Sequence, residues 1–217
     1  MSSSLQQLYP GLQARPEVSD GELTNSIAAK AANSVEVKTR FFAASAPTLI
    51  EIARGLAYCF RRGGRLFTMG NGGSASDAAH VAVEFNHPVT VGRPALPAEH
   101  LGHDTQFMSA VANDVGFDQV FARQISSLGR SGDALLGLST SGNSKNLLAA
   151  FAAAKRRGIL TIGFSGHDGG QMKTAVDHCL VVDSDSVHRI QESHVAAYHV
   201  LWDLVHTLLA QERGGEQ

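Results

Sequence analysis

From residue 65 onward, short apolar runs alternate with segments in which apolar residues recur at helical spacing. The apolar runs cover residues 65–70, 133–140, 159–166 and 177–184. The helical segments cover residues 74–85, 146–158 and 188–212. Runs that are apolar throughout, without polar alternation, are typical of parallel strands buried on both faces. The pattern therefore predicts an α/β domain built on a doubly wound parallel sheet.

The chain before the first apolar run is predicted to be helical. Residues 22–62 are expected to form two helices, each with an apolar stripe at helical spacing. The stripes consist of Ile27, Ala31, Val35 and Val37, and of Leu49, Ile52, Leu56 and Phe60. Pro47 suits the first turn of the second helix, where a missing N–H costs nothing. Residues 1–20 are predicted to be a flexible arm, and residues 21–213 a single domain that includes the helical extension.

Composition narrows the class of protein. The chain has 217 residues, 43% of them hydrophobic, and a formal net charge of −2, so charge gives no reason to expect nucleic acid as a ligand. Cys59 and Cys179 lie far apart in apolar segments, which favours buried thiols over a disulfide framework. No apolar run approaches the roughly 20 residues of a membrane span, and the first residues do not resemble a signal peptide. We expect no membrane partner and a cytoplasmic location.

Two turns predicted at the carboxyl edge of the sheet carry candidate chemistry. They read GNGGSASDAAH (70–80) and STSGNS (139–144), and each lies between a predicted strand and a predicted helix. Such a turn presents unpaired N–H groups and the positive end of a helix dipole, which together attract phosphate. The hydroxyls of the second turn add donors, and no Walker lysine pattern is present. The turns therefore favour a phosphorylated small molecule. The alternative is that Asn143 or Ser144 only caps the following helix.

Several segments in this order resemble the phosphoheptose isomerases, which are sugar-isomerase (SIS) domain proteins. They are MGNGGSASDAAH (69–80), ANDVGFDQVFARQ (112–124), LSTSGNS (138–144), GHDGGQM (166–172) and RIQESHVAAYH (189–199). The resemblance covers roughly residues 35–209. It implies a five-stranded parallel SIS sheet, a homotetramer with active sites at subunit contacts, and the interconversion of sedoheptulose 7-phosphate and D-glycero-D-manno-heptose 7-phosphate.

The resemblance also implies a catalytic pair. Glu84 matches the carboxylate that removes a proton from carbon, and His199 matches the histidine that moves protons at the sugar oxygens, through an enediol. Taken alone, Glu84 is also compatible with a solvated helix carboxylate and His199 with a core histidine. The pair bears on the function class, because a related SIS protein that binds the bacterial replication initiator lacks both residues. A non-catalytic sugar-phosphate-binding or partner-docking module, or an isomerase of another ketose phosphate, is the alternative.

Further site residues follow from the same matching. The sugar phosphate is expected to contact Asn71, Gly72, Gly73, Glu84, Asn113, Asp114, Ser139, Thr140, Ser141, Ser144 and Gln191. Zinc is the implied cofactor, with His80, Glu84, Gln191 and His199 as ligands. His80 and Glu84 are four residues apart and share a helix face. Gln191 and His199 lie about 12 Å apart along a helix and roughly 80° around it, so one of them is a weak ligand or the ligands come from different subunits. For Asn113 and Asp114, a turn or helix cap is the alternative.

One segment departs from the family. Residues 85–104 read FNHPVTVGRPALPAEHLGHD, where the family has a Leu-Thr-Gly-Arg-like stretch. The unusual residues are His87, Glu99, His100 and His103, together with His188 further along the chain. They are interpreted as ordinary loop variation; the alternatives are an altered substrate end or an additional metal site. His167, His178 and His206 are assigned to surface or core packing.

Overall fold

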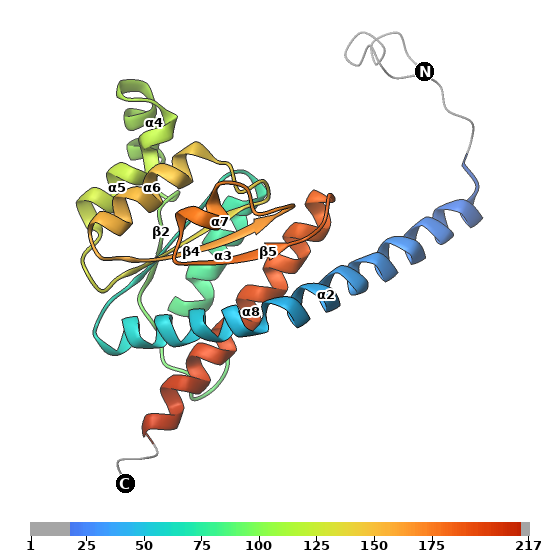
Figure 1. Cartoon of the computed structure of the whole chain (residues 1–217), viewed down its shortest axis with the longest axis horizontal. Coiled ribbons are helices and arrows are strands. Elements are labelled where there is room, and N and C mark those ends of the chain that lie inside the picture. The colour runs from blue at the N-terminus through green and yellow to red at the C-terminus, as the bar shows by residue number, and fades with distance from the viewer. Residues whose placement is uncertain (1–17, 214–217) are drawn as a thin grey trace. The chain divides into compact units, whose positions relative to one another are not determined.

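A five-stranded parallel sheet organises the chain, which is described here by a computed structural model over residues 18–213 (Figure 1). The strands are β1 (Leu66–Gly70), β2 (Ala98–His100), β3 (Ala134–Ser139), β4 (Leu160–Gly166) and β5 (His178–Val182). Their order is β2-β1-β3-β4-β5, and every neighbouring pair is parallel. This confirms the predicted fold class, a doubly wound five-stranded sheet with a helical extension before it.

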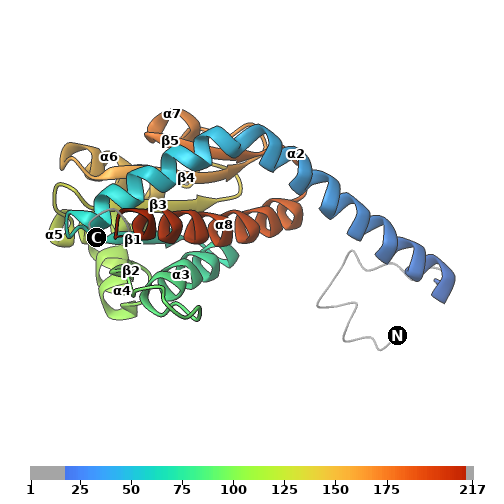
Figure 2. The ribbon, with the colours of Figure 1, turned by 90° about the horizontal axis from the view of Figure 1, so that it is seen from below.

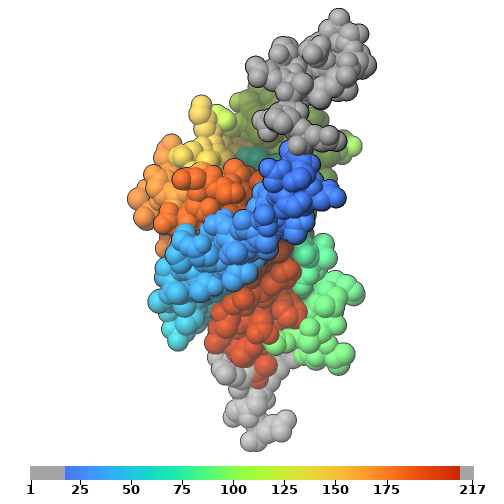
Figure 3. Space-filling view, turned by 90° about the vertical axis from the view of Figure 1, so that its right-hand side faces the viewer, coloured from blue at the N-terminus to red at the C-terminus, as the bar shows by residue number. Residues whose placement is uncertain are grey.

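Helices cover both faces of the sheet (Figure 2). They are α2 (Asp20–Arg61), α3 (Gly73–Asn86), α4 (Thr105–Asp114), α5 (Val120–Leu128), α6 (Lys145–Arg156), α7 (Met172–Ala175) and α8 (Val187–Arg213), with a 3₁₀ turn at Phe117–Gln119. The second half of α2 packs with α3 and α8 on one face, and Figure 3 shows α2 beside α8. The other face carries α5, α6 and α7. None of the helices within residues 18–213 has the length and hydropathy that a membrane span needs.

The strands supply two separate cores because successive side chains point to opposite faces. Leu66 packs with α2, α3 and α8, whereas Phe67 packs with α5 and α6. The same division holds for Leu136 and Leu135 of β3. All four side chains are fully buried, which is why these runs contain no polar alternation.

The prediction of two N-terminal helices is wrong, because one helix of 42 residues runs through Pro47. Proline removes one helical hydrogen bond, and here that loss is solvent-facing because both Pro47 and Ala43, four residues earlier, are exposed. By contacts the chain divides into two compact units that meet at Val35 and Glu36. In the first unit, the side chains of Leu23 and Ile27 are exposed. The predicted arm falls almost entirely on residues 1–17, outside the described residues.

The edge strand β2 lies in the segment that departs from the family. The apolar runs of the sequence indicated only four strands, because β2 has three half-buried residues and no apolar pattern. Its start is held by Asn86, whose side chain accepts a hydrogen bond from the Ala98 N–H (3.0 Å) and donates one to the Ala98 carbonyl (2.7 Å). A short polar edge strand leaves too little local pattern for a prediction from sequence.

Candidate functional site

The turns after β3 and β4 are locked together at the carboxyl edge of the sheet. The N–H of Met172 donates to the carbonyl of Gly142 (2.9 Å), and that of Gln171 donates to Asn143 Oδ1 (3.0 Å). Gly142 has φ +63°, and a Cβ there would lie 2.1 Å from the Gly169 carbonyl oxygen. Only glycine fits this close approach of two backbones. The STSGN turn therefore has one fixed shape.

Hydroxyl groups face one another where this turn enters α6. Ser139 Oγ and Ser144 Oγ are 2.9 Å apart. Ser144 is the N-cap residue of α6, but its side chain makes no capping hydrogen bond. The capping alternative therefore fails for the Ser144 side chain. The start of α6 keeps N–H groups and a positive dipole end that an anion can use.

A pair of amides joins the first turn to the second. Asn71 and Asn146 exchange two side-chain hydrogen bonds, with each Nδ2 donating to the other Oδ1 (3.0 and 2.9 Å). Asn146 is buried in the first turn of α6, whereas Asn71 precedes the Gly72-Gly73 turn into α3. These hydrogen bonds therefore tie the turn after β1 to the start of α6, next to the turn after β3. Sequence reasoning missed Asn146, although it lies only two residues beyond STSGNS.

His80, Glu84 and His199 come together from α3 and α8. Ligand atoms of the three side chains all lie within 4.8 Å of one another, and they form the only such group within residues 18–213. His80 Nε2 is 3.0 Å from Glu84 Oε1, and the rings of His80 and His199 are 5.3 Å apart between centroids. Glu84 is half-buried and both histidines are exposed. The carboxylate and the imidazole thus face a common region of solvent, as the catalytic assignment requires.

Helices α3 and α8 run side by side in register over two to three turns. Three contacts join residues 118 positions apart in sequence: Gly73 with Gln191, His80 with Tyr198, and Glu84 with Trp202. Tyr198 Oη is 2.8 Å from His80 Nδ1, and the indole N–H of Trp202 donates to the Glu84 carbonyl (2.8 Å). Sequence reasoning missed both aromatic residues, because their positions in the α8 pattern are typical of core.

This register separates Gln191 from the other three expected zinc ligands. A Cβ on Gly73 would lie 2.5 Å from Gln191 Nε2, so the amide covers the start of α3. His80 lies two turns further along α3, about 10 Å away along the axis. Within one chain, Gln191 is therefore placed at the phosphate-binding turn, where it suits a substrate contact.

Burial changes the protonation of groups behind the site. It raises the pKa of Tyr198 to about 12, with the charges of Asp77 and Glu84 adding to the effect, so the phenol stays protonated. Burial also raises the pKa of Asp77, against the opposing charge of His80. His194 is fully buried on α8, and desolvation lowers its pKa to about 4 despite a hydrogen bond to the Ser165 carbonyl. His194 is therefore neutral at pH 7.

The histidines of α8 divide between core and surface, which tests an alternative left open by the sequence. His199 is exposed, so the interpretation as a core histidine is wrong. His206 fills that description instead, because it is buried and its two ring nitrogens lie 3.0 Å from the Trp202 carbonyl and 3.1 Å from the Pro94 carbonyl. His178 is half-buried, and the half-buried His167 lies 3.5 Å from Asp185, consistent with packing roles.

Two expected substrate contacts, Asn113 and Asp114, lie in α4. Asn113 and Asp114 are the last two residues of α4, both exposed, and the Asn113 amide donates to the Asp114 carboxylate (2.9 Å). Neither residue is a turn residue or the cap of α4, whose C-cap is Val115, and their role as substrate contacts stays a prediction. The unusual histidines do not form a second metal group within residues 18–213. His100, at the end of β2, has a pKa lowered chiefly by burial, and its carbonyl is 2.5 Å from His103 Nδ1.

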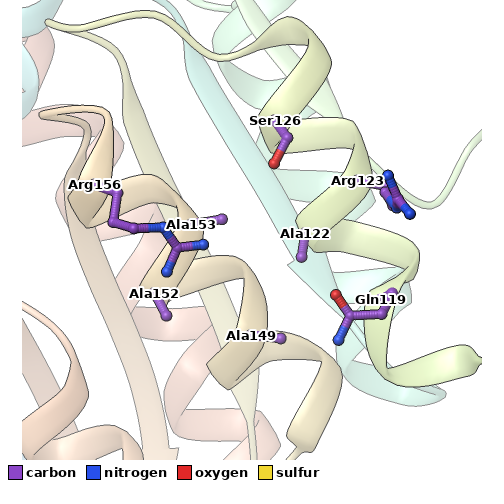
Figure 4. Close-up of a pocket in the computed structure, with 8 residues that line it drawn as sticks. All are labelled: Gln119, Ala122, Arg123, Ser126, Ala149, Ala152, Ala153 and Arg156. Carbon is purple, nitrogen blue, oxygen red and sulfur yellow. The ribbon is translucent and has the colours of Figure 1, made fainter. Parts of the chain in front are cut away.

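A separate hollow of about 390 Å³ lies between α5 and α6 (Figure 4). Gln119 and Arg156 reach into it over a floor of alanines. Its full lining is Gln119, Ala122, Arg123, Ser126, Ala149, Ala152, Ala153 and Arg156. That lining holds no carboxylate or imidazole, so this hollow does not supply acid–base chemistry.

Comparison with known proteins agrees with this geometry. The family model described as "SIS domain" matches residues 31–166. The chain therefore belongs to the SIS domain family.

Individual relatives show to which group of SIS domain proteins the chain belongs. A phosphoheptose isomerase of Desulfovibrio desulfuricans is 50% identical over 179 residues, which cover 82% of this chain and 85% of that protein. The structure of the phosphoheptose isomerase of Neisseria gonorrhoeae superposes with a TM-score of 0.79 at 36% identity, covering 84% and 98% of the two chains. That of Francisella tularensis gives 0.81 at 32% identity, covering 85% and 98%. Within the SIS family, the chain is an isomerase of the phosphoheptose isomerase group.

Proposed function

We propose that the chain interconverts D-sedoheptulose 7-phosphate and D-glycero-D-manno-heptose 7-phosphate through an enediol. The observation that carries this proposal is the group formed by His80, Glu84 and His199, with ligand atoms within 4.8 Å of one another. Proton transfer between adjacent carbons needs a base at carbon and a donor at oxygen within reach of one substrate. Glu84 and His199 meet that requirement from two helices.

The two ends of the substrate have separate tasks. The phosphate is bound by the turn from Ser139 to Ser144 at the start of α6, where N–H groups and hydroxyls neutralise charge. Gln191 and the Gly72-Gly73 turn bind the sugar next to it. At the other end, Glu84 removes the proton from carbon, and His199 moves protons at the oxygens. Binding the phosphate orients the reacting carbons against Glu84.

The donor set also suits zinc. Two imidazoles and one carboxylate are the ligands found in catalytic zinc sites with an open position. We propose that His80, Glu84 and His199 hold the ion, and that Gln191, if it is a ligand, comes from a neighbouring subunit. Zinc would supply a Lewis acid for a substrate oxygen.

A homotetramer with active sites at subunit contacts is part of the same proposal. Its support in the chain is the set of exposed apolar side chains on α2: Val35 is 63% and Ile27 69% exposed. Such side chains favour burial against another copy. A cytoplasmic location goes with a substrate whose phosphate prevents passage through membranes.

The test is conversion itself. The protein is incubated with sedoheptulose 7-phosphate, with and without added zinc, and NMR is used to detect the aldose phosphate. Glu84→Gln should abolish conversion, whereas Glu51→Gln, on the exposed face of α2, should not. No conversion by the unsubstituted protein would favour a non-catalytic SIS module, and a panel of ketose phosphates would reveal a different substrate. Conversion by Glu84→Gln would overturn the assignment of the base.

A further inference from the structure

Two aromatic residues of α8 lie directly behind two of the three clustered side chains. Tyr198 contacts His80, and Trp202 contacts Glu84. His80 and Glu84 are four residues apart on α3, and Tyr198 and Trp202 are four residues apart on α8. Each helix therefore presents its two residues one turn apart. Neither aromatic residue belongs to the group of possible metal ligands.

We propose that Tyr198 and Trp202 are positioning residues that fix the His80 imidazole and the Glu84 backbone. The proposal rests on the proposed function for the role of Glu84. Tyr198 acts on the imidazole ring, and Trp202 acts on the main chain that carries the carboxylate. Together they hold the pair from α8.

Tyr198 controls the proton arrangement of His80. A carboxylate can only accept, so His80 Nε2 donates to Glu84 Oε1 (3.0 Å). In the neutral ring, Nδ1 then accepts from the Tyr198 hydroxyl (2.8 Å). If the ring held a metal, its remaining N–H would donate to the same hydroxyl. The buried phenol therefore serves both states, as partners of metal-binding histidines do.

Trp202 completes the last turn of α3. Glu84 is two residues from the end of the helix, where backbone carbonyls have no helical partner. The Trp202 indole N–H donates a hydrogen bond to the Glu84 carbonyl (2.8 Å). The ring is fixed in turn by the Arg93 guanidinium, 5.4 Å from its centroid, and Arg93 pairs with Asp203 (2.7 Å). Fraying of this turn would displace the carboxylate.

The test removes one polar atom at a time. Tyr198→Phe and Trp202→Phe keep an aromatic ring in place, and Thr161→Val is the control. The Thr161 hydroxyl donates a part-buried hydrogen bond to the Asp177 carboxylate (2.7 Å), at the amino end of strand β4 and away from the site. Zinc affinity is measured by chelator competition, and kcat and KM are measured for the isomerisation.

Tyr198→Phe should weaken zinc binding by about 10- to 100-fold, the usual effect of losing such a partner. Trp202→Phe should lower kcat about tenfold with KM changed by less than twofold, since a displacement of the reacting group acts mainly on the chemical step. Thr161→Val should change neither, although it lowers stability.

Zinc affinity and kcat that stay within twofold of the unsubstituted protein in both variants would overturn the proposal. Zinc affinity is independent of turnover, so a protein that binds zinc normally but converts no heptose phosphate fails the proposed function alone. If the protein binds no zinc, the kcat of Trp202→Phe and Tyr198→Phe tests the proposal instead. A protein that neither binds zinc nor converts a heptose phosphate overturns the proposal.

Discussion

His194 makes the stability of the fold depend on pH, because burial changes its protonation between the unfolded and the folded chain. Its ring is completely buried beside Phe164, with Nε2 3.1 Å from the Ser165 carbonyl. Nδ1 has no hydrogen-bond partner in the described chain. Desolvation therefore lowers the pKa of His194 from 6.5 to about 4 in the folded protein. Between these values the unfolded chain binds a proton that the folded chain does not.

This difference in bound protons sets the direction in which stability changes with pH. A depressed folded pKa gives stability that is fully present above pH 6.5 and is lost as the pH falls toward 4. Integrating the two titrations from pH 7 to pH 5 gives a loss of about 2 kcal/mol in the free energy of unfolding. That is a large fraction of the stability of a typical domain.

The assay compares unfolding by urea at pH 7, 6 and 5 for the unsubstituted protein and His194→Gln. Glutamine keeps a donor for the Ser165 carbonyl but cannot titrate, so its profile should be flatter by about 2 kcal/mol. Both proteins are measured at one concentration with a chelator, because association and metal binding also shift stability. His100, whose pKa burial also lowers, is present in both proteins and cancels. Parallel profiles for the two proteins would refute the reasoning.

Three further predictions concern the turns. Gly142→Ala should lower the free energy of unfolding, measured in urea, by at least about 2 kcal/mol. The new Cβ would lie 2.1 Å from the Gly169 carbonyl oxygen, and the residue would have to keep a φ of +63°. Unchanged stability would contradict the close contact of the two turns. Asn146→Ala should lower the free energy of unfolding by about 1–3 kcal/mol and raise KM, because Asn71 loses both of its amide hydrogen bonds. A KM that stays constant in steady-state kinetics would show that the role of Asn146 is purely structural. Ser144→Ala should weaken competitive inhibition by inorganic phosphate several-fold and lower stability by only about 0.5–1.5 kcal/mol, because the hydroxyl does not cap α6 and only its hydrogen bond to Ser139 is lost. A larger loss of stability with unchanged inhibition would restore the capping interpretation.

The pattern of apolar and polar residues predicted four of the five strands and the chemistry at the carboxyl edge of the sheet. Strands β1, β3, β4 and β5 were predicted within two residues at each end, because fully buried parallel strands are continuous apolar runs. The STSGNS turn was recognisable because hydroxyls and glycine before a helix have a local physical meaning. The pairing of Glu84 with His199 came from family resemblance, since 115 residues separate them and no spacing rule connects them.

Features that depend on contacts between distant segments could not be predicted from the sequence and are seen only in the folded chain. Only the three-dimensional register of α3 and α8 places Tyr198 behind His80 and moves Gln191 to the start of α3. The continuous α2 depends on Pro47 facing solvent, and the low pKa of His194 depends on complete burial. Hydrophobic periodicity reports which face of an element is buried, but it does not report which partner lies across that face. Helix register, amide pairs and desolvation are set by that partner, so they could be read only from the folded chain.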